Sequence, residues 1–114
     1  MDVITMTHYL IAQIKVNDDK WIPDYAANVL DIVTRYGGRY LSRSSNITAL
    51  EGNPPDMDML AIIAFPDMEA LQGFLADPEY APFAKARQSG TDSHFVAVDS
   101  TDAANAIPYL DIAS

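Results

Sequence analysis

The sequence predicts an α+β domain whose elements follow the order β-α-β-β-α-β. Two segments carry most of this prediction. Residues 59–65 are apolar throughout, which is typical of a strand that is covered on both faces. Residues 20–36 instead repeat their apolar positions at helical spacing, and two glycines follow them directly. A buried strand next to an amphipathic helix indicates a sheet with helices packed on it.

The first two elements are a strand at 8–16 and a helix from about 20 to 36. In the strand, each even-numbered residue from 10 to 16 is apolar, so that face should be buried. Asn17-Asp18-Asp19 then breaks the strand and offers capping side chains for the helix. Pro23 falls in the first helical turn, where a missing N–H costs least, and Gly37 supplies the left-handed residue that ends many helices.

A second strand is predicted over residues 39–51. Its alternation is imperfect, it carries two arginines, and polar residues 44–46 interrupt it, so an edge strand with a bulge is expected. The turn-forming residues 52–56 follow, and the third strand occupies 57–65. Its apolar character places it in the middle of the sheet.

The last third of the chain predicts a helix, a short second helix and a final strand. Asp67 is the expected cap of the first of these helices. Asp77 and Pro78 are expected to end it and to start the short helix, with Asp77 as the cap and Pro78 in its first position. The final strand is predicted at 94–98.

This order of elements predicts the ferredoxin-like arrangement, in which right-handed crossovers put both helices on one face of a four-stranded antiparallel sheet. The first and third strands then lie in the middle, which agrees with their being the most apolar. Residues 1–99 form this domain, and residues 100–114 form a tail. The apolar residues of the tail suggest that it docks on a partner subunit, and disorder is an equal alternative.

The helices can cover only one face of the predicted sheet, yet strands one, three and four carry apolar residues on both. The residues that would be left uncovered come from these pairs: Tyr9 and Ile11, Leu60 and Ile62 or Ala61 and Ile63, and Phe95 and Ala97 or Val96 and Val98. A second copy that packs sheet to sheet would remove this exposed patch. The sequence therefore predicts a homodimer, in the form of a dimeric α/β barrel.

Composition excludes several classes of protein. Seven basic and sixteen acidic residues give a net charge of −9, which repels nucleic acid, and the basic residues do not cluster. The chain has no cysteine, which excludes disulfides and thiolate chemistry. Its N-terminus does not resemble a signal peptide, and its longest apolar run is too short to span a membrane. A cytoplasmic protein without membrane or nucleic-acid partners is expected.

Four residues are candidates for binding a small ligand: Tyr25, Arg43, Tyr80 and Arg87. An arginine with two tyrosines suits a carboxylate or an enolate, because guanidinium binds an oxyanion through two parallel hydrogen bonds. A purely structural interpretation competes with this one. The tyrosines lie on apolar helix faces, where core residues are common, and the arginines have carboxylates to pair with. These carboxylates are Glu51, Glu79 and Asp92.

The two histidines are predicted at opposite ends of neighbouring strands, because His8 begins the first strand and His94 begins the last. That placement disfavours a metal site made by both within one subunit. His94 alone could act as a general base. No phosphate loop, dinucleotide fingerprint or histidine-glutamate metal motif occurs, so no metal or cofactor is expected.

The chain resembles the family known as DUF1330, a set of small dimeric α/β-barrel proteins. The resemblance covers about residues 7–99 and rests on these residues: Tyr25, Gly37-Gly38-Arg39-Tyr40-Leu41, Arg43, Leu50-Glu51-Gly52, Ile63-Ala64-Phe65-Pro66, Asp77-Pro78-Glu79-Tyr80, Arg87 and Ser93. It implies the fold and the dimer, and the family has no agreed activity to transfer.

Two functions therefore stay open from the sequence. The first is a small dimeric module that binds an apolar or carboxylate-bearing metabolite. The second is a cofactor-independent enzyme of the monooxygenase, isomerase or decarboxylase type, in which His94 acts with Arg43 and Arg87. The second interpretation is an analogy at the level of the fold.

Overall fold

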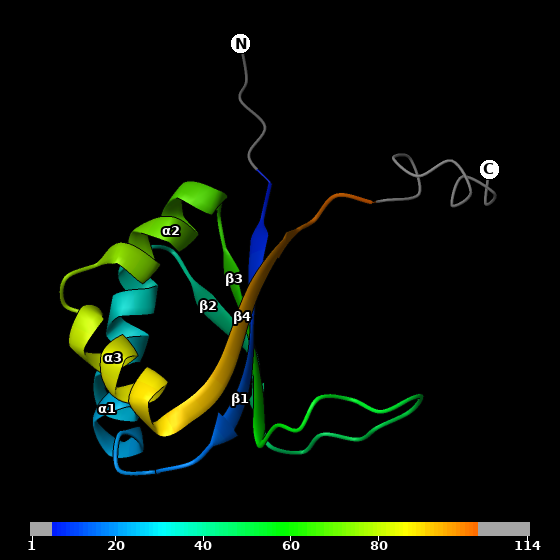
Figure 1. Ribbon diagram of the computed structural model, residues 1–114. Coiled ribbons are helices and arrows are strands. Elements are labelled where there is room, and N and C mark those ends of the chain that lie inside the picture. Colours follow the sequence, from blue (N-terminus) through cyan, green and yellow to red (C-terminus); the bar gives the residue numbers. More distant parts are fainter. Residues whose placement is uncertain (1–5, 103–114) are drawn as a thin grey trace, which may run out of the picture.

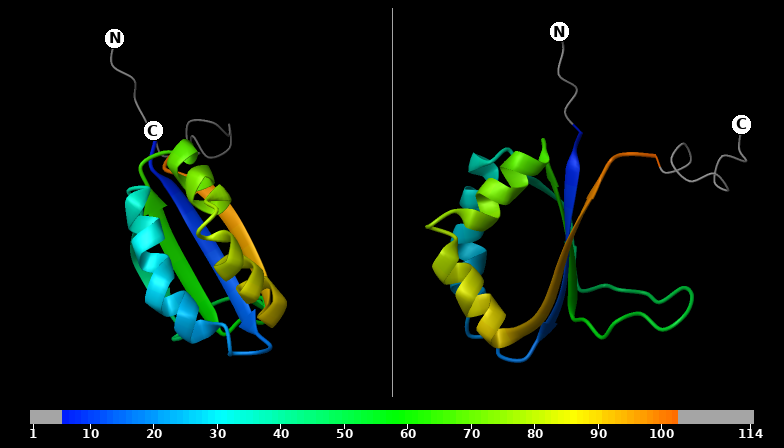
Figure 2. Two further views of the ribbon diagram at one scale, coloured as in Figure 1. Left: turned by 90° about the vertical axis from the view of Figure 1, so that its left-hand side faces the viewer. Right: turned by 45° about the horizontal axis from the view of Figure 1, so that its top comes forward.

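The computed structural model describes residues 6–102, which form a four-stranded sheet covered on one side by a layer of helices (Figure 1). The elements in chain order are β1 (His8–Val16), α1 (Ile22–Arg35), β2 (Arg39–Ser44), β3 (Met59–Phe65), α2 (Met68–Ala76), α3 (Ala81–Gly90) and β4 (Thr91–Asp99). All three helices lie on the same side of the sheet, as the side view in Figure 2 shows. The predicted ferredoxin-like arrangement is confirmed.

The strands lie in the order β2-β3-β1-β4, and each neighbouring pair is antiparallel. The two most apolar strands, β1 and β3, are therefore central, as predicted. The register places Leu10 opposite Ile63 of β3 and Ala97 of β4. Alternate residues along β1, β3 and β4 face the helices, and this face carries the core.

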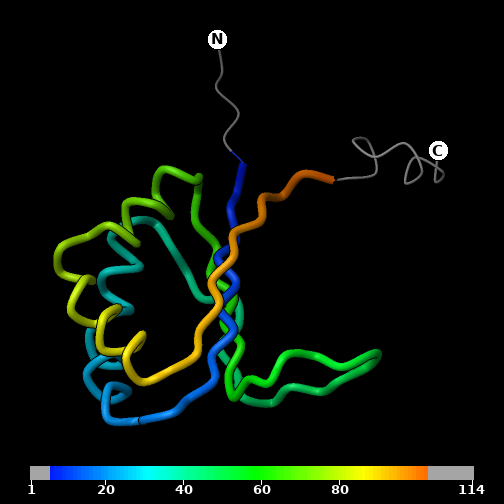
Figure 3. The backbone as a smooth tube through the Cα atoms, viewed as in Figure 1, coloured from blue at the N-terminus to red at the C-terminus, as the bar shows by residue number. Residues whose placement is uncertain are grey.

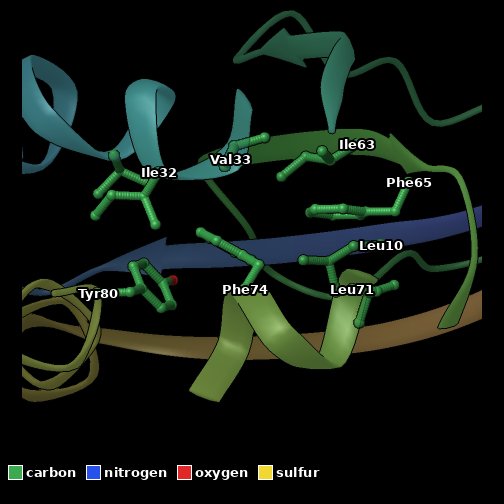
Figure 4. Close-up of a cluster of buried hydrophobic side chains, with 9 residues drawn as sticks. Leu10, Ile32, Val33, Ile63, Phe65, Leu71, Phe74 and Tyr80 are labelled. Atoms are coloured by element: carbon green, nitrogen blue, oxygen red, sulfur yellow. The ribbon is translucent and has the colours of Figure 1, made fainter. Parts of the chain in front are cut away.

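The core between sheet and helices is rich in aromatic residues (Figure 4). Phe74 of α2 stacks on Phe65 with ring centres 5.6 Å apart, and its ring centre lies 4.3 Å from that of Tyr80. All three side chains are at most 1% exposed. The aliphatic members of the same cluster are Leu10, Val29, Ile32, Val33, Ile63 and Leu71.

The helix α1 begins differently from the prediction. Its cap position is Trp21, which makes no capping hydrogen bond, and Asp18 instead accepts from the Lys20 N–H, 2.9 Å away, in the turn before the helix. At its other end Gly37 has a φ of 76°, as expected for a left-handed helix terminus. Gly38 has a different reason to be glycine, because a Cβ there would come within 2.7 Å of both Phe65 and Val33.

The second strand is shorter than predicted. It spans Arg39–Ser44 with a register shift between Tyr40 and Ser42, and residues 47–50 are not part of the sheet. Residues 45–58 instead form a long loop that projects from the sheet on the side away from the helices (Figure 3). Its base is held by Asp58, whose side chain accepts from the Val16 N–H at 2.7 Å and whose N–H donates to Ile14 O at 2.7 Å.

The last elements also differ in their boundaries. The Asp67 side chain caps α2 as predicted, by accepting from the Ala70 N–H at 2.7 Å. Asp77 orders the following turn by accepting from the Glu79 N–H, but α3 begins only at Ala81 and carries Pro82 in its first turn. The α3 helix then runs directly into β4, which is longer than the predicted strand 94–98.

The outer face of the sheet, which the helices leave open, is apolar along its centre. Register pairs Ile11 with Ile62 on β3 and with Val96 on β4. The next row on the same face lies two residues along β1 and pairs Tyr9 with Ala64 and Val98. Val96 and Val98 are 56% and 50% exposed. The uncovered set predicted from the sequence is thus resolved to Tyr9, Ile11, Leu60, Ile62, Val96 and Val98.

Two predictions, on membrane spans and on the C-terminal tail, can be compared with the described residues. Among residues 6–102, no helix has the length and apolar character needed to cross a membrane. The predicted docking tail falls mostly on residues 103–114, which lie outside the described part of the chain.

A hydrogen bond between helices provides a pH-dependent prediction for stability. Tyr36 Oη donates to Asp77 Oδ2 at 2.6 Å, and this bond holds the pKa of the Asp77 carboxyl below its ordinary value. A carboxyl group with a lowered folded pKa adds stability above its unfolded pKa. That stability is lost as the pH falls through the folded pKa. Replacing Tyr36 with Phe should therefore destabilise the protein at neutral pH and have a smaller effect in acid.

Urea denaturation of the wild type and Tyr36→Phe, compared between about pH 7 and about pH 3, measures this difference. A free-energy difference that stays the same over the whole range would show that the hydroxyl does not act through the ionised carboxylate.

Candidate functional site

A cavity of about 410 Å³ lies between α1 and the helix-facing side of the sheet. Sites that hold small organic molecules in proteins have volumes of roughly 300–1,000 Å³. The α1 helix contributes Ile22, Tyr25 and Ala26 to the lining, and all four strands contribute to the rest. Most of the lining is apolar, and five of its members are aromatic: Trp21, Tyr25, Tyr40, Phe74 and Phe95.

The cavity exists because the sheet is lined with small side chains at its centre. Ala12 of β1 pairs directly with Ala61 of β3, and both are buried members of the lining. The same row across the sheet ends in Arg43 on β2 and Phe95 on β4. Two methyl groups between two large side chains leave a hollow that the helix above does not fill.

Two of the predicted site residues meet at the inner end of the cavity. The Tyr25 and Tyr80 hydroxyls are 2.6 Å apart, and Tyr25 lines the cavity whereas Tyr80 is 1% exposed within the core. Burial raises the pKa of Tyr25, with a further rise from Tyr80 and an opposing effect of Arg87. The hydroxyl of Tyr25 therefore keeps its proton at neutral pH.

Arg87 is buried beside this pair without a carboxylate partner. Its side chain is 4% exposed, and its guanidinium carbon lies 4.1 Å from the centre of the Phe95 ring. Phe95 lines the cavity, and Arg87 lies behind it. The Nε of Arg87 makes no hydrogen bond within the described chain. Burying a charge without an opposite charge is costly, so this arrangement requires an explanation.

The contacts that hold Arg87 are all neutral. Nη1 donates to Ser93 Oγ at 2.7 Å, and Ser93 Oγ lies 2.6 Å from Thr91 Oγ1. Thr91 Oγ1 in turn donates to the Arg87 carbonyl oxygen at 2.7 Å, so Ser93 is the donor to Thr91. This closed ring fixes the direction of each bond and positions the guanidinium, but it leaves the positive charge uncompensated.

Arg43 lies at the opposite end of the row, at the border of the cavity. It is exposed, and its guanidinium carbon lies 4.5 Å from the centre of the Tyr40 ring. Burial raises the pKa of Tyr40, which Arg43 opposes. The arginine–carboxylate pairs considered from the sequence are not formed among the described residues. Glu79 pairs with Arg35 at 2.7 Å instead.

The structure does not bring His94 to this cavity. His94 pairs in register with Gln13, which places it on the outer face of the sheet, whereas Arg43 and Arg87 lie on the helix side. His8 pairs with Asp99 at the far end of the same two strands, so the predicted separation of the histidines is observed. Within residues 6–102, no cluster of three or more potential metal ligands occurs.

Sequence reasoning missed the residues that shape the cavity. Trp21, Tyr40 and Phe95 line it, and Ala12 and Ala61 create its floor. The only signal for the alanines is their small size within two otherwise bulky strands. That signal becomes meaningful once the register shows that they face each other.

The fold and this cavity define a ferredoxin-like α+β protein with an apolar site beneath its first helix. A family model described as a domain of unknown function, DUF1330, matches residues 7–101. The chain belongs to that family, as the resemblance in its sequence indicated. Among curated proteins, none matches the chain.

Solved structures resemble the chain in fold at low sequence identity. A protein of unknown function from Rhodopseudomonas palustris has a TM-score of 0.72 at 14% identity, with 87% of this chain and 85% of that chain covered. SnoaB, a cofactor-independent oxygenase from Streptomyces nogalater, has a TM-score of 0.60 at 17% identity, with coverages of 86% and 96%. A dimeric ferredoxin-like protein of unknown function from Thermobifida fusca has a TM-score of 0.53 at 13% identity, with coverages of 87% and 95%.

Proposed function

We propose that this protein binds a small apolar or carboxylate-bearing metabolite in the cavity beneath α1. The observation that carries the proposal is the cavity itself, which has the volume of a small-molecule site and a largely apolar lining. Two alanines that face each other at the centre of the sheet maintain this space, although larger side chains would fill it.

Filling the cavity is expected to weaken binding. Ala26 of α1 borders the cavity, and a tryptophan there gains apolar contacts by lying across it. Ala27 is the next residue, is exposed, and does not belong to the lining, so Ala27→Trp is the matched control. We expect Ala26→Trp to weaken binding at least roughly tenfold, a loss of about 1.4 kcal/mol, and Ala27→Trp to leave it unchanged.

Calorimetry with 2-naphthoate and 2-naphthol as probes, together with their effect on the melting temperature, measures this difference. If neither probe binds the wild type, or if Ala26→Trp and Ala27→Trp bind them equally well, the proposal fails.

A cofactor-independent enzyme is the alternative function, and the oxygenase SnoaB shares the fold. Proton abstraction from a bound substrate would need a base within hydrogen-bond reach. None of the residues that line the cavity is Asp, Glu or His. His94, the base considered from the sequence, lies on the opposite face of the sheet from Arg43 and Arg87. The geometry therefore favours binding over catalysis.

The assembly that we propose is a homodimer in which the outer faces of two sheets pack together. The apolar rows around Ile11 and Tyr9 support it, because such a patch is costly to expose. The loop 45–58 projects on the same side of the sheet, where it can reach a second copy (Figure 1). The structural neighbour from Thermobifida fusca is described as dimeric.

Sedimentation at micromolar concentration should give the mass of two 12.5 kDa chains. A mass of one chain would overturn the assembly.

A further inference from the structure

The charged residues at the cavity are basic, whereas the chain as a whole is acidic. The sequence has sixteen acidic and seven basic residues, yet the one charged residue in the lining is Arg43. The charged residue behind the lining is Arg87, which is 4% exposed and stacks on Phe95. Neither arginine has a carboxylate within ion-pair distance among residues 6–102. The charged side chain in the lining and the one that stacks on it are thus both arginines, although the protein is acidic.

The direction of the hydrogen bond between the two tyrosines follows from the surroundings of each. Tyr80 is 1% exposed, and the hydroxyl of Tyr25 is the hydrogen-bond partner that the described structure gives it. If Tyr25 donated, the Tyr80 proton would be left without an acceptor in an apolar core, which is unfavourable. If Tyr80 donates, the free proton belongs to Tyr25, which lines the cavity. The second arrangement leaves neither tyrosine proton unpaired once a molecule in the cavity accepts from Tyr25.

We propose that the ligand is an apolar molecule with an anionic oxygen, and that this oxygen accepts a hydrogen bond from Tyr25 next to the uncompensated charge of Arg87. Tyr80 is a positioning residue, because its donated proton directs the Tyr25 proton into the cavity. Hydrogen bonds in such a chain strengthen one another. Arg87 acts from behind Phe95 through its field. The apolar body of the ligand lies over Ala12 and Ala61.

This inference rests on the proposed ligand-binding function and selects between the two ligand types that the proposal leaves open. Three matched probes separate the possibilities at about pH 7.5, where the carboxylate and the amine are ionised. They are 2-naphthoate (an anion), 2-naphthalenemethanol (neutral) and 2-naphthylmethylamine (a cation). Calorimetry should show that the anion binds at least roughly tenfold more tightly than the neutral probe and that the cation binds most weakly.

Variants locate the source of this preference. Tyr25→Phe removes the donor, Tyr80→Phe removes the residue that orients it, and Arg87→Met removes the charge. Each should reduce the ratio of the neutral probe's Kd to the anion's Kd. The ratio is measured within one variant, so a general loss of packing, which weakens both probes, does not change it. Tyr36→Phe, a hydroxyl deletion outside the cavity lining, is the control and should keep the wild-type ratio.

The outcomes separate this inference from the proposed function. If no probe binds, the binding function fails and the inference fails with it. If the neutral probe binds as tightly as the anion, the binding function stands and the inference is overturned. An anion preference that persists unchanged in Tyr25→Phe and Arg87→Met would also overturn it, because the preference would then arise elsewhere.

Discussion

Ile62→Glu is expected to abolish the proposed homodimer. Ile62 lies on the central strand β3, on the outer face, and pairs with Ile11 of β1. Two sheets that pack face to face would bury this position in both copies. A carboxylate buried there without a partner loses its hydration, and the penalty is several kcal/mol for each charge. A loss of about 2.8 kcal/mol already weakens association roughly 100-fold.

The matched control places the same charge on the helix layer, at the exposed residue Ala27 of α1. Sedimentation of the wild type, Ile62→Glu and Ala27→Glu at one concentration compares the three masses. We expect the wild type and Ala27→Glu to be dimers and Ile62→Glu to be a folded monomer by circular dichroism. If Ile62→Glu kept the dimeric mass, the two copies would have to associate through another surface.

The part of the fold that could be predicted from the sequence is the part that hydrophobic burial determines. Residues 59–65 are apolar on both faces, and the structure places them at the centre of the sheet as β3. The second strand was predicted too long because residues 47–50 include apolar side chains that the sheet does not use. Leu50 is 92% exposed at its position in the loop. Apolar residues in a sequence therefore predict a strand even where the chain forms an exposed loop.

Predicting the candidate site was less successful, for a geometric reason. Tyr25 and Tyr80 are distant in sequence, and their contact depends on how α1 and α3 pack. His94 was a candidate because of its chemistry, but a shift of one residue along a strand reverses the face that a side chain occupies. Polar and apolar residues both occur on each face of β4, so the sequence pattern does not determine its register. The register in the structure pairs His94 with Gln13, and His94 therefore faces away from the cavity.

Phe74→Ala is expected to cause a large loss of folding stability. Phe74 is 1% exposed, stacks on Phe65 and contacts Tyr80, so it joins β3 to the turn before α3. Truncating a buried phenylalanine to alanine costs about 3–5 kcal/mol, because the transfer free energy is lost and a cavity remains. Small domains are stable by only about 5–15 kcal/mol, so this loss is a large fraction of the total.

Leu75 is the next residue on α2 and is 40% exposed, so Leu75→Ala is the matched control and should cost less than about 1 kcal/mol. Urea unfolding of both variants is compared at a fixed protein concentration, since association contributes to the apparent stability. Phe74 also lines the cavity beneath α1, and its removal enlarges that cavity toward Phe65. Equal midpoints for Phe74→Ala and Leu75→Ala would mean that the aromatic cluster does not hold the helices on the sheet.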